Sequence, residues 1–141
     1  MTLLPLMAFA AMIALQPAPG NDGTAGDSAA AAPVSFDEIP ITQATAPRCG
    51  VAFAVAQGLQ DAGDERASDW PDLKAAGGQE FFVRAMANLM DARALDRPAV
   101  VTLVEAEVAR HRADDYAQLS QMMPGCLLLL EASPDLRGEG S

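Results

Sequence analysis

Apolar residues that recur at helical spacing are the feature that most constrains the fold of this chain. The clearest run shares intervals of three and four residues: Cys49, Ala52, Phe53, Ala56 and Leu59. This spacing places all five side chains on one face of a helix. Thr45 is a suitable N-cap for that helix, and Pro47 lies close to the first turn, where proline is tolerated. No segment alternates polar and apolar residues for long enough to predict a strand, so we expect an all-α fold.

Two further helices are predicted in the middle of the chain. The first of them runs from about Gly78 to Arg93, with apolar side chains on one side. The next begins after Asp96, whose side chain can cap it, and Pro98 lies in its first turn. Between the helices, residues 61–77 are expected to form a polar loop.

The C-terminal part predicts one more helix with a break in it. Asp114 can cap this helix, which Pro124 is expected to interrupt because an interior proline removes a backbone hydrogen bond. Residues Cys126–Leu130 then resume as one or two apolar turns. We therefore expect a small bundle of four to five short helices over residues 45–133.

The composition changes on both sides of this predicted domain. Residues 21–44 are rich in Pro, Ala and Gly, and such a segment buries too little apolar surface to offset the entropy of ordering it. We expect a disordered linker there, although Val34–Ile41 offers a few apolar residues that can lie against the domain as an extended strand. Residues 134–141 are expected to form a disordered tail.

The first twenty residues are typical of a signal peptide. They carry no charged side chain, and residues 3–15 are apolar apart from Pro5. This run is too short to span a bilayer, which requires about 20 residues. Small residues suit cleavage after Gly20 or after Ala25, although the usual Lys or Arg near the start is missing. We expect residues 1–20 to direct the protein to the periplasm or out of the cell; the alternative is an N-terminal helix of a cytosolic protein.

The charge of the chain excludes several classes of partner. The formal net charge is −10, from 9 Lys and Arg against 19 Asp and Glu. A nucleic-acid binder needs clustered basic residues for phosphate contacts, and anionic lipid surfaces attract the same residues. We therefore expect no nucleic-acid partner, and no stable membrane insertion once the signal segment is removed. The expected partner is a protein or a small molecule of unknown identity.

The two cysteines, Cys49 and Cys126, predict a disulfide. An even number of cysteines in an exported protein favours pairing. The alternatives are redox activity or metal ligation, but there is no Cys-x-x-Cys motif, and two cysteines alone do not make a zinc site.

Few residues suggest catalysis or metal binding. His111, the only histidine, shares a helix face with Glu107 and, if the helix continues, with Asp115. Such a group can ligate a metal or transfer a proton, but a solvated surface with paired charges is the simpler interpretation. No nucleotide, zinc-protease, haem or hydrolase motif is present, so we expect no catalytic residue and no cofactor.

Met122 and Met123, together with Cys126 and His111, are weak candidates for a copper site, because thioether and thiolate ligands suit Cu(I). Methionine is also common core material, and the expected disulfide would remove one thiolate. The carboxylates of residues 61–77 lack the spacing of a calcium loop.

Three aromatic residues are candidate interaction residues: Trp70, Phe81 and Phe82. Trp70 can alternatively fold back on the core as a lid, together with Leu73. An exposed aromatic residue would offer a partner a large apolar contact.

A family resemblance involves the predicted domain. Its markers are the pair Phe81-Phe82, Asp96 at a helix start, and two widely separated cysteines, within GQEFFVRAMANLMDARALDRPAVVTLVEAEVARHRAD and MMPGCLLLLEAS. These segments resemble a set of small exported helical proteins of GC-rich Gram-negative bacteria. The resemblance implies no activity for any residue. The architecture is also similar to that of periplasmic acid-stress chaperones, by analogy alone.

The sequence thus favours a non-enzymatic binding or interaction protein of the periplasm or cell envelope. A stress chaperone is the alternative, followed by a metal-binding protein or a small enzyme.

Overall fold

The computed structural model describes residues 31–139, and the fold over these residues is all-α, as the sequence predicts. Four helices and two 3-10 turns follow one another along the chain: η1 (Phe36–Glu38), α1 (Ile41–Asp61), η2 (Glu65–Ala67), α2 (Gly78–Arg93), α3 (Arg97–Ala113) and α4 (Ala117–Ala132). No strand is present within this range. The predicted signal peptide, its cleavage sites and the linker up to residue 30 lie outside the described residues.

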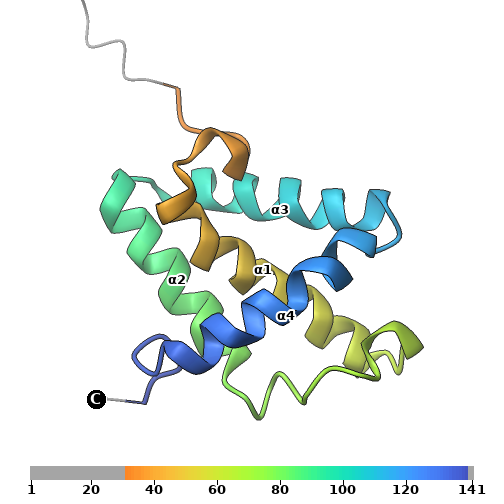
Figure 1. Cartoon of the computed structure of the whole chain (residues 1–141). Helices are drawn as coiled ribbons and strands as arrows, with labels where there is room; N and C mark the ends of the chain where they lie inside the picture. The colour runs from red at the N-terminus through yellow and green to blue at the C-terminus, as the bar shows by residue number, and fades with distance from the viewer. Residues whose placement is uncertain (1–30, 140–141) are drawn as a thin grey trace, which may run out of the picture. The chain divides into compact units, whose positions relative to one another are not determined.

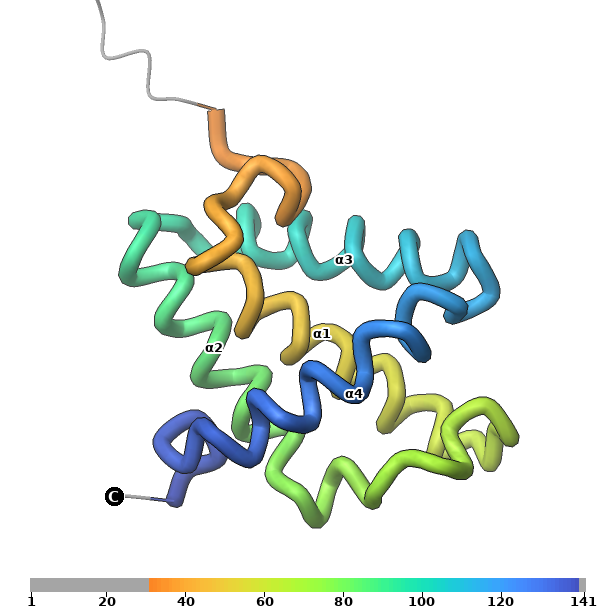
Figure 2. Tube along the Cα trace, viewed as in Figure 1, coloured from red at the N-terminus to blue at the C-terminus, as the bar shows by residue number. Residues whose placement is uncertain are grey.

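Helix α1 is the centre of the bundle, and the other three helices pack around it (Figures 1 and 2). Its buried residues include the predicted stripe, all of which contributes to the core: Cys49, Ala52, Phe53, Ala56 and Leu59. Since one face of α1 meets α2 and another meets α4, more of its surface is buried than a single stripe requires. Val51, on a different side of α1, belongs to a second buried cluster with η1, α2 and α3.

The predicted linker is ordered from its C-terminal part onward, which corrects the boundary at residue 44. Helix α1 begins at Ile41, four residues before Thr45, and η1 precedes it. Phe36 and Ile39 are buried at 1% and 5% exposure, so the apolar residues of this segment anchor it to the domain. The segment forms a 3-10 turn, capped by Ser35, rather than an extended strand.

Helices α1 and α2 cross at a close approach of their backbones. A Cβ atom on Gly50 would lie 3.0 Å from the Cα atom of Phe82, so only glycine fits there without a shift. Nearby, the rings of Phe53 and Phe81 pack edge to face, with centroids 5.3 Å apart. Gly50 therefore permits the close approach of the two helices, and the Phe53–Phe81 pair stabilises it.

The predicted limits of α2 and the predicted start of α3 are confirmed. Helix α2 spans Gly78–Arg93, as expected. The Asp96 side chain caps α3 by accepting a hydrogen bond from the backbone N–H of Ala99 at 2.9 Å, and proline occupies the first turn. This cap satisfies a backbone donor that α3 itself leaves unpaired.

Helix α4 continues through Pro124, so the predicted interruption is wrong. The helix is unbroken over Ala117–Ala132. Pro124 lies on the exposed side, whereas Met123 and Cys126 are buried at 0% and 2% exposure. Packing of the buried side sustains the helix on both sides of the lost hydrogen bond, which is a tertiary override of a local preference.

The loop between α1 and α2 folds back on the core, as one of the two interpretations of Trp70 predicts. Leu73 is fully buried, and Trp70 is half-buried against the main core. The Gln60 side chain fixes this loop: its amide donates to the carbonyls of Trp70 and Pro71, and its oxygen accepts from the Leu73 N–H at 3.2 Å.

The predicted tail is also ordered, as far as Glu139. Leu136 packs against the main core, and a Cβ atom on Gly77 would lie 3.4 Å from Arg137. Residues 134–139 therefore cover the start of α2. None of the described helices has both the length and the apolar character needed to cross a membrane.

The predicted disulfide is confirmed, since Cys49 and Cys126 are bonded at 2.05 Å with their Cα atoms 5.2 Å apart. It joins α1 to α4 across 77 residues of sequence. In the chain-entropy description, closing a loop of that length contributes about 4.5 kcal/mol to stability.

Candidate functional site

The aromatic candidates do not form an exposed surface. Phe81 is completely buried in the core, which excludes it as an interaction residue. Phe82 is half-buried against the second cluster, and Trp70 is half-buried against the main core. Their role is packing: Phe82 meets Gly50 at the α1–α2 crossing.

His111 and Glu107 lie inside the protein, so the interpretation of a solvated surface is wrong. Their exposed fractions are 0% and 1%. Asp115 does not join them; it lies beyond the end of α3, exposed, and pairs with Arg66. Both ring nitrogens of His111 lack a hydrogen-bond partner, and its Nε2 lies 3.9 Å from the nearer Glu107 oxygen.

Glu107 is the centre of a cluster of charges that we call the Glu107 cluster, made by Asp37, Arg48, Glu107, Arg110 and His111. Arg48 from α1 donates to Glu107 at 3.1 Å, and Arg110 from α3 lies 3.5 Å from its other oxygen. Asp37 of η1 bridges the same two arginines at 3.2 and 2.7 Å. The cluster thus ties η1, α1 and α3 together.

Two pKa shifts follow from this geometry. Burial lowers the pKa of His111 below its ordinary value of 6.5, and this effect outweighs the opposing influence of Glu107 and Asp114. The imidazole is therefore neutral at pH 7. The hydrogen bond from Arg110, together with the charges of Arg110 and Arg48, lowers the pKa of Asp37. Asp37 thus remains ionised and keeps η1 in place.

The residues considered for metal binding are not gathered into a site. Met122 is half-buried, Met123 is fully buried, and Cys126 is consumed by the disulfide. Within residues 31–139, no group of three or more His, Cys, Asp or Glu side chains is placed to hold a metal ion.

In the acidic loop, the carboxylate of Asp64 is already paired with a basic side chain. Arg66 donates to the Asp64 carboxylate at 2.9 and 2.6 Å, which lowers the pKa of Asp64 to about 2. A shallow hollow of about 570 Å³ lies beside this loop, but mostly polar side chains line it.

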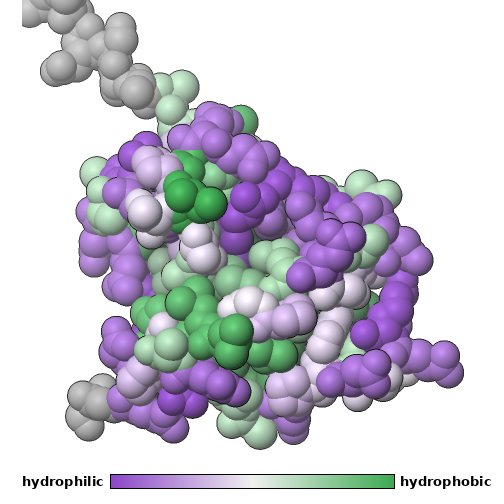
Figure 3. Space-filling view, viewed as in Figure 1, coloured by the Kyte–Doolittle hydropathy of each residue, from purple (hydrophilic) through white to green (hydrophobic). Residues whose placement is uncertain are grey.

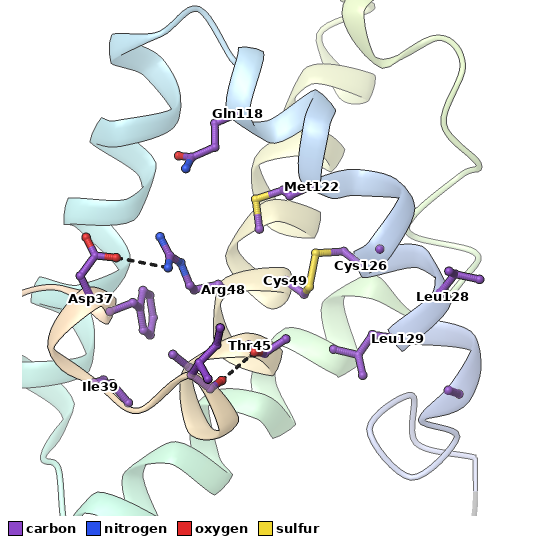
Figure 4. Close-up of a pocket in the computed structure, with 15 residues that line it drawn as sticks. Asp37, Ile39, Thr45, Arg48, Cys49, Gln118, Met122, Cys126, Leu128 and Leu129 are labelled. Carbon is purple, nitrogen blue, oxygen red and sulfur yellow. Dashed lines mark hydrogen bonds and ion pairs between the residues drawn. A yellow bond between two sulfur atoms is a disulfide. The ribbon is translucent and has the colours of Figure 1, made fainter.

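A larger hollow lies between the start of α1, η1 and α4, and we call it the α1–α4 groove. Its volume is about 970 Å³. The contributing residues come from three segments: Phe36, Asp37 and Ile39 of the η1 region, Ile41, Ala44, Thr45, Arg48 and Cys49 of α1, and Gln118, Met122, Gly125, Cys126, Leu128, Leu129 and Ala132 of α4. Figure 4 shows Met122 and Leu129 directed from α4 toward the start of α1, and Arg48 paired with Asp37 at one end.

The rims of the α1–α4 groove are apolar and exposed. Ile41 is 79% exposed and Leu128 is 68% exposed, and these are the two most exposed large apolar side chains of the described residues. Figure 3 shows hydrophobic surface over the start of α1 and over the C-terminal half of α4, with a hollow between them. Such a concentration of apolar surface around a concavity is typical of binding sites.

Helix α4 supplies the groove because it is apolar over more of its surface than the core uses. One stripe is buried against α1: Leu119, Met123, Cys126 and Leu130. The adjacent stripe faces the groove: Gln118, Met122, Gly125, Leu129 and Ala132. The run of four leucines from Leu127 to Leu130 is the sequence signal of this second stripe, since four consecutive apolar residues cannot all face one core.

The charge that lines the groove is limited to one ion pair. Its only charged side chains are Asp37 and Arg48, which neutralise each other. The single buried histidine is sealed from it at 0% exposure. What the groove presents is apolar surface with an ion pair at one end.

Comparisons of this chain with protein-family models, with curated proteins and with solved structures found no match.

Proposed function

We propose that this protein is a non-enzymatic binding protein of the periplasm or cell envelope, and that the α1–α4 groove is its binding site. The observation that carries the proposal is an open apolar groove whose rims, Ile41 and Leu128, are exposed at 79% and 68%. Keeping large aliphatic side chains in water has a cost of about 25 cal/mol per Å². A ligand that covers them recovers this free energy.

The architecture beneath the groove supports the same function. The Cys49–Cys126 disulfide lies in its floor and fixes α1 against α4. The Asp37 carboxylate holds η1 on Arg48 and Arg110, so the third wall is fixed as well. A site with a preorganised shape loses less entropy on binding than a flexible surface does.

A fluorescence titration with Nile red, a neutral dye that brightens in apolar surroundings, tests the site. We expect saturable binding to the intact protein and a loss of about tenfold in affinity for Leu128→Asp, since a charge on the rim must be desolvated. Val83→Asp is the matched control, because Val83 is an exposed aliphatic residue of α2, at 52% exposure, away from the groove.

The control decides the interpretation of the dye experiment. Val83→Asp is expected to bind the dye as the unchanged protein does. If Leu128→Asp and Val83→Asp bind equally well, or if the unchanged protein does not bind, the groove is not the site and the proposal fails.

The proposed export of the protein is tested by a separate measurement. The disulfide suits an oxidising compartment, and the apolar run at residues 3–15 suits export. The intact mass of protein recovered from the periplasm of a Gram-negative host is expected to match cleavage near Gly20 or Ala25. An uncleaved chain that stays in the cytoplasm would contradict the location.

A further inference from the structure

The groove-facing stripe of α4 has the spacing of a helix-packing seam. Its residues follow one another at intervals of four, three, four and three: Gln118, Met122, Gly125, Leu129 and Ala132. Alternating intervals of this kind keep side chains on one line along a helix and receive the side chains of a facing helix. The seam covers about 21 Å of helix axis at about 1.5 Å per residue.

Gly125 lies in the middle of this seam and leaves it open. A Cβ atom built on Gly125 would meet no atom within 4 Å, so no packing inside the protein requires a glycine there. Its φ is not positive, because the positive-φ glycines of the described residues are Gly63, Gly77 and Gly138. A glycine inside a helix costs about 0.5–1 kcal/mol relative to alanine. The surroundings of Gly125 leave room above it, so a helix that crosses α4 at this point can approach closely.

The charges around the groove restrict the occupant. Helix α4 contains no Lys or Arg and carries one acidic residue, Glu131, and η1 adds Glu38, whereas Asp37 is already paired with Arg48 and Arg110. The one basic residue of the groove, Arg48, is already bonded to Asp37 and Glu107. An anionic lipid or fatty acid would find no free cation there. A second copy of the chain would bring a further charge of −10, which disfavours self-association.

From these features we infer that the α1–α4 groove binds an amphipathic helix of a partner protein, with its apolar face along the α4 seam and with Lys or Arg at its flanks. The partner helix packs between α4 and the start of α1, with its backbone closest to Gly125. Leu129 and Met122 contact its apolar side chains, and Glu38 and Glu131 attract its basic flanks. This inference rests on the proposed function, since it assigns a ligand class to the same groove.

The test uses a fluorescently labelled peptide of about 15 residues, the length of the seam. The peptide carries leucines at alternating intervals of three and four and lysines elsewhere, and its scrambled version has the same composition. At about 0.15 M salt, which screens weak charge attraction, fluorescence anisotropy is expected to show saturable binding of the patterned peptide and at least about tenfold weaker binding of the scrambled one, whose apolar face is lost.

Gly125→Ala then locates the peptide, with Gly58→Ala as the matched control. Both glycines are exposed, inside long helices, and free of neighbours within 4 Å. Both variants are expected to raise the thermal midpoint. Only Gly125→Ala is expected to lower the affinity for the patterned peptide, by about tenfold, because an added methyl group overpacks a close helix crossing.

Each outcome decides between the two proposals. If Nile red binds as expected but the patterned and scrambled peptides bind alike, the groove remains a binding site and the helical ligand is wrong. The ligand is also wrong if Gly125→Ala and Gly58→Ala bind the patterned peptide equally. Dimerisation of the free protein in sedimentation, with the groove closed to the peptide, would replace the partner helix by a second copy. If neither dye nor peptide binds, the proposed function fails first.

Discussion

At the scale of single residues, His111 is unusual among the described side chains. It is completely buried, neither ring nitrogen has a partner, and the cluster of Glu107, Arg48 and Arg110 surrounds one side of it. A buried imidazole without hydrogen bonds favours its neutral form strongly, because a buried charge loses its hydration. The folded state therefore disfavours protonation of His111, so the stability of the fold depends on pH.

This dependence predicts a loss of stability in mild acid. Folding lowers the pKa of His111 below 6.5, so the unfolded chain binds a proton more readily than the folded protein does. The free energy of unfolding is largest above pH 6.5 and falls as the pH drops below that value. Urea unfolding at about pH 7.5 and pH 5.5, on either side of the ordinary histidine pKa, measures the difference.

His111→Leu is the control, because leucine fills an apolar site and cannot titrate. Since His111 is the only histidine, the variant is expected to lose most of the stability difference between the two pH values. An equal difference in the variant and in the unchanged protein would show that His111 is not responsible.

At the scale of elements, the crossing of α1 and α2 depends on one missing side chain. We expect Gly50→Ala to destabilise the protein by about 1–3 kcal/mol, because its methyl group would lie 3.0 Å from the Phe82 backbone and the two helices would have to separate. Gly58→Ala on the same helix is expected to stabilise it by about 0.5–1 kcal/mol. Thermal or urea unfolding measures the stability of both variants. If Gly50→Ala leaves the free energy of unfolding unchanged, the two helices are not closely packed at this crossing.

The sequence predicted the starts of α2 and α3 correctly, whereas α4 begins at Ala117, three residues after the expected cap Asp114, which instead ends α3. Helix α3 has a side-chain cap at Asp96 and a proline in its first turn, and the expected start is correct. Helix α1 begins without a side-chain cap, after Pro40, so its start was placed too late. The break expected at Pro124 is absent because buried neighbours outweigh the local preference of proline.

The candidate site was less accessible to sequence analysis, for a physical reason. The helical spacing did place Glu107 and His111 on one face, but whether that face is solvated or buried depends on η1 and α1, which are distant in sequence. The groove likewise joins segments some 70 residues apart, residues 41–49 and 118–132. The local sequence signal of the groove is the run of four leucines in α4, because one buried stripe cannot accommodate all four side chains.

At the scale of the whole molecule, the described helices form a cross-linked bundle that leaves the apolar α1–α4 groove open. The disulfide links the central helix to the last one, and the Glu107 cluster links η1, α1 and α3. Both constraints lie beside the α1–α4 groove and fix its walls. A protein that unfolds to expose apolar surface, as an acid-activated chaperone does, would gain little from such cross-links, whereas a constitutive binding site needs a fixed shape.

The most direct measurement is a two-dimensional ¹H–¹⁵N NMR titration of the protein with hexan-1-ol, a small soluble apolar molecule. We expect saturable shifts that concentrate on amides lining the α1–α4 groove, including Thr45, Met122 and Leu129. We expect little change around Trp70, beside the polar hollow. Shifts that are scattered over the surface, or that are largest around Trp70, would show that this groove is not the binding site.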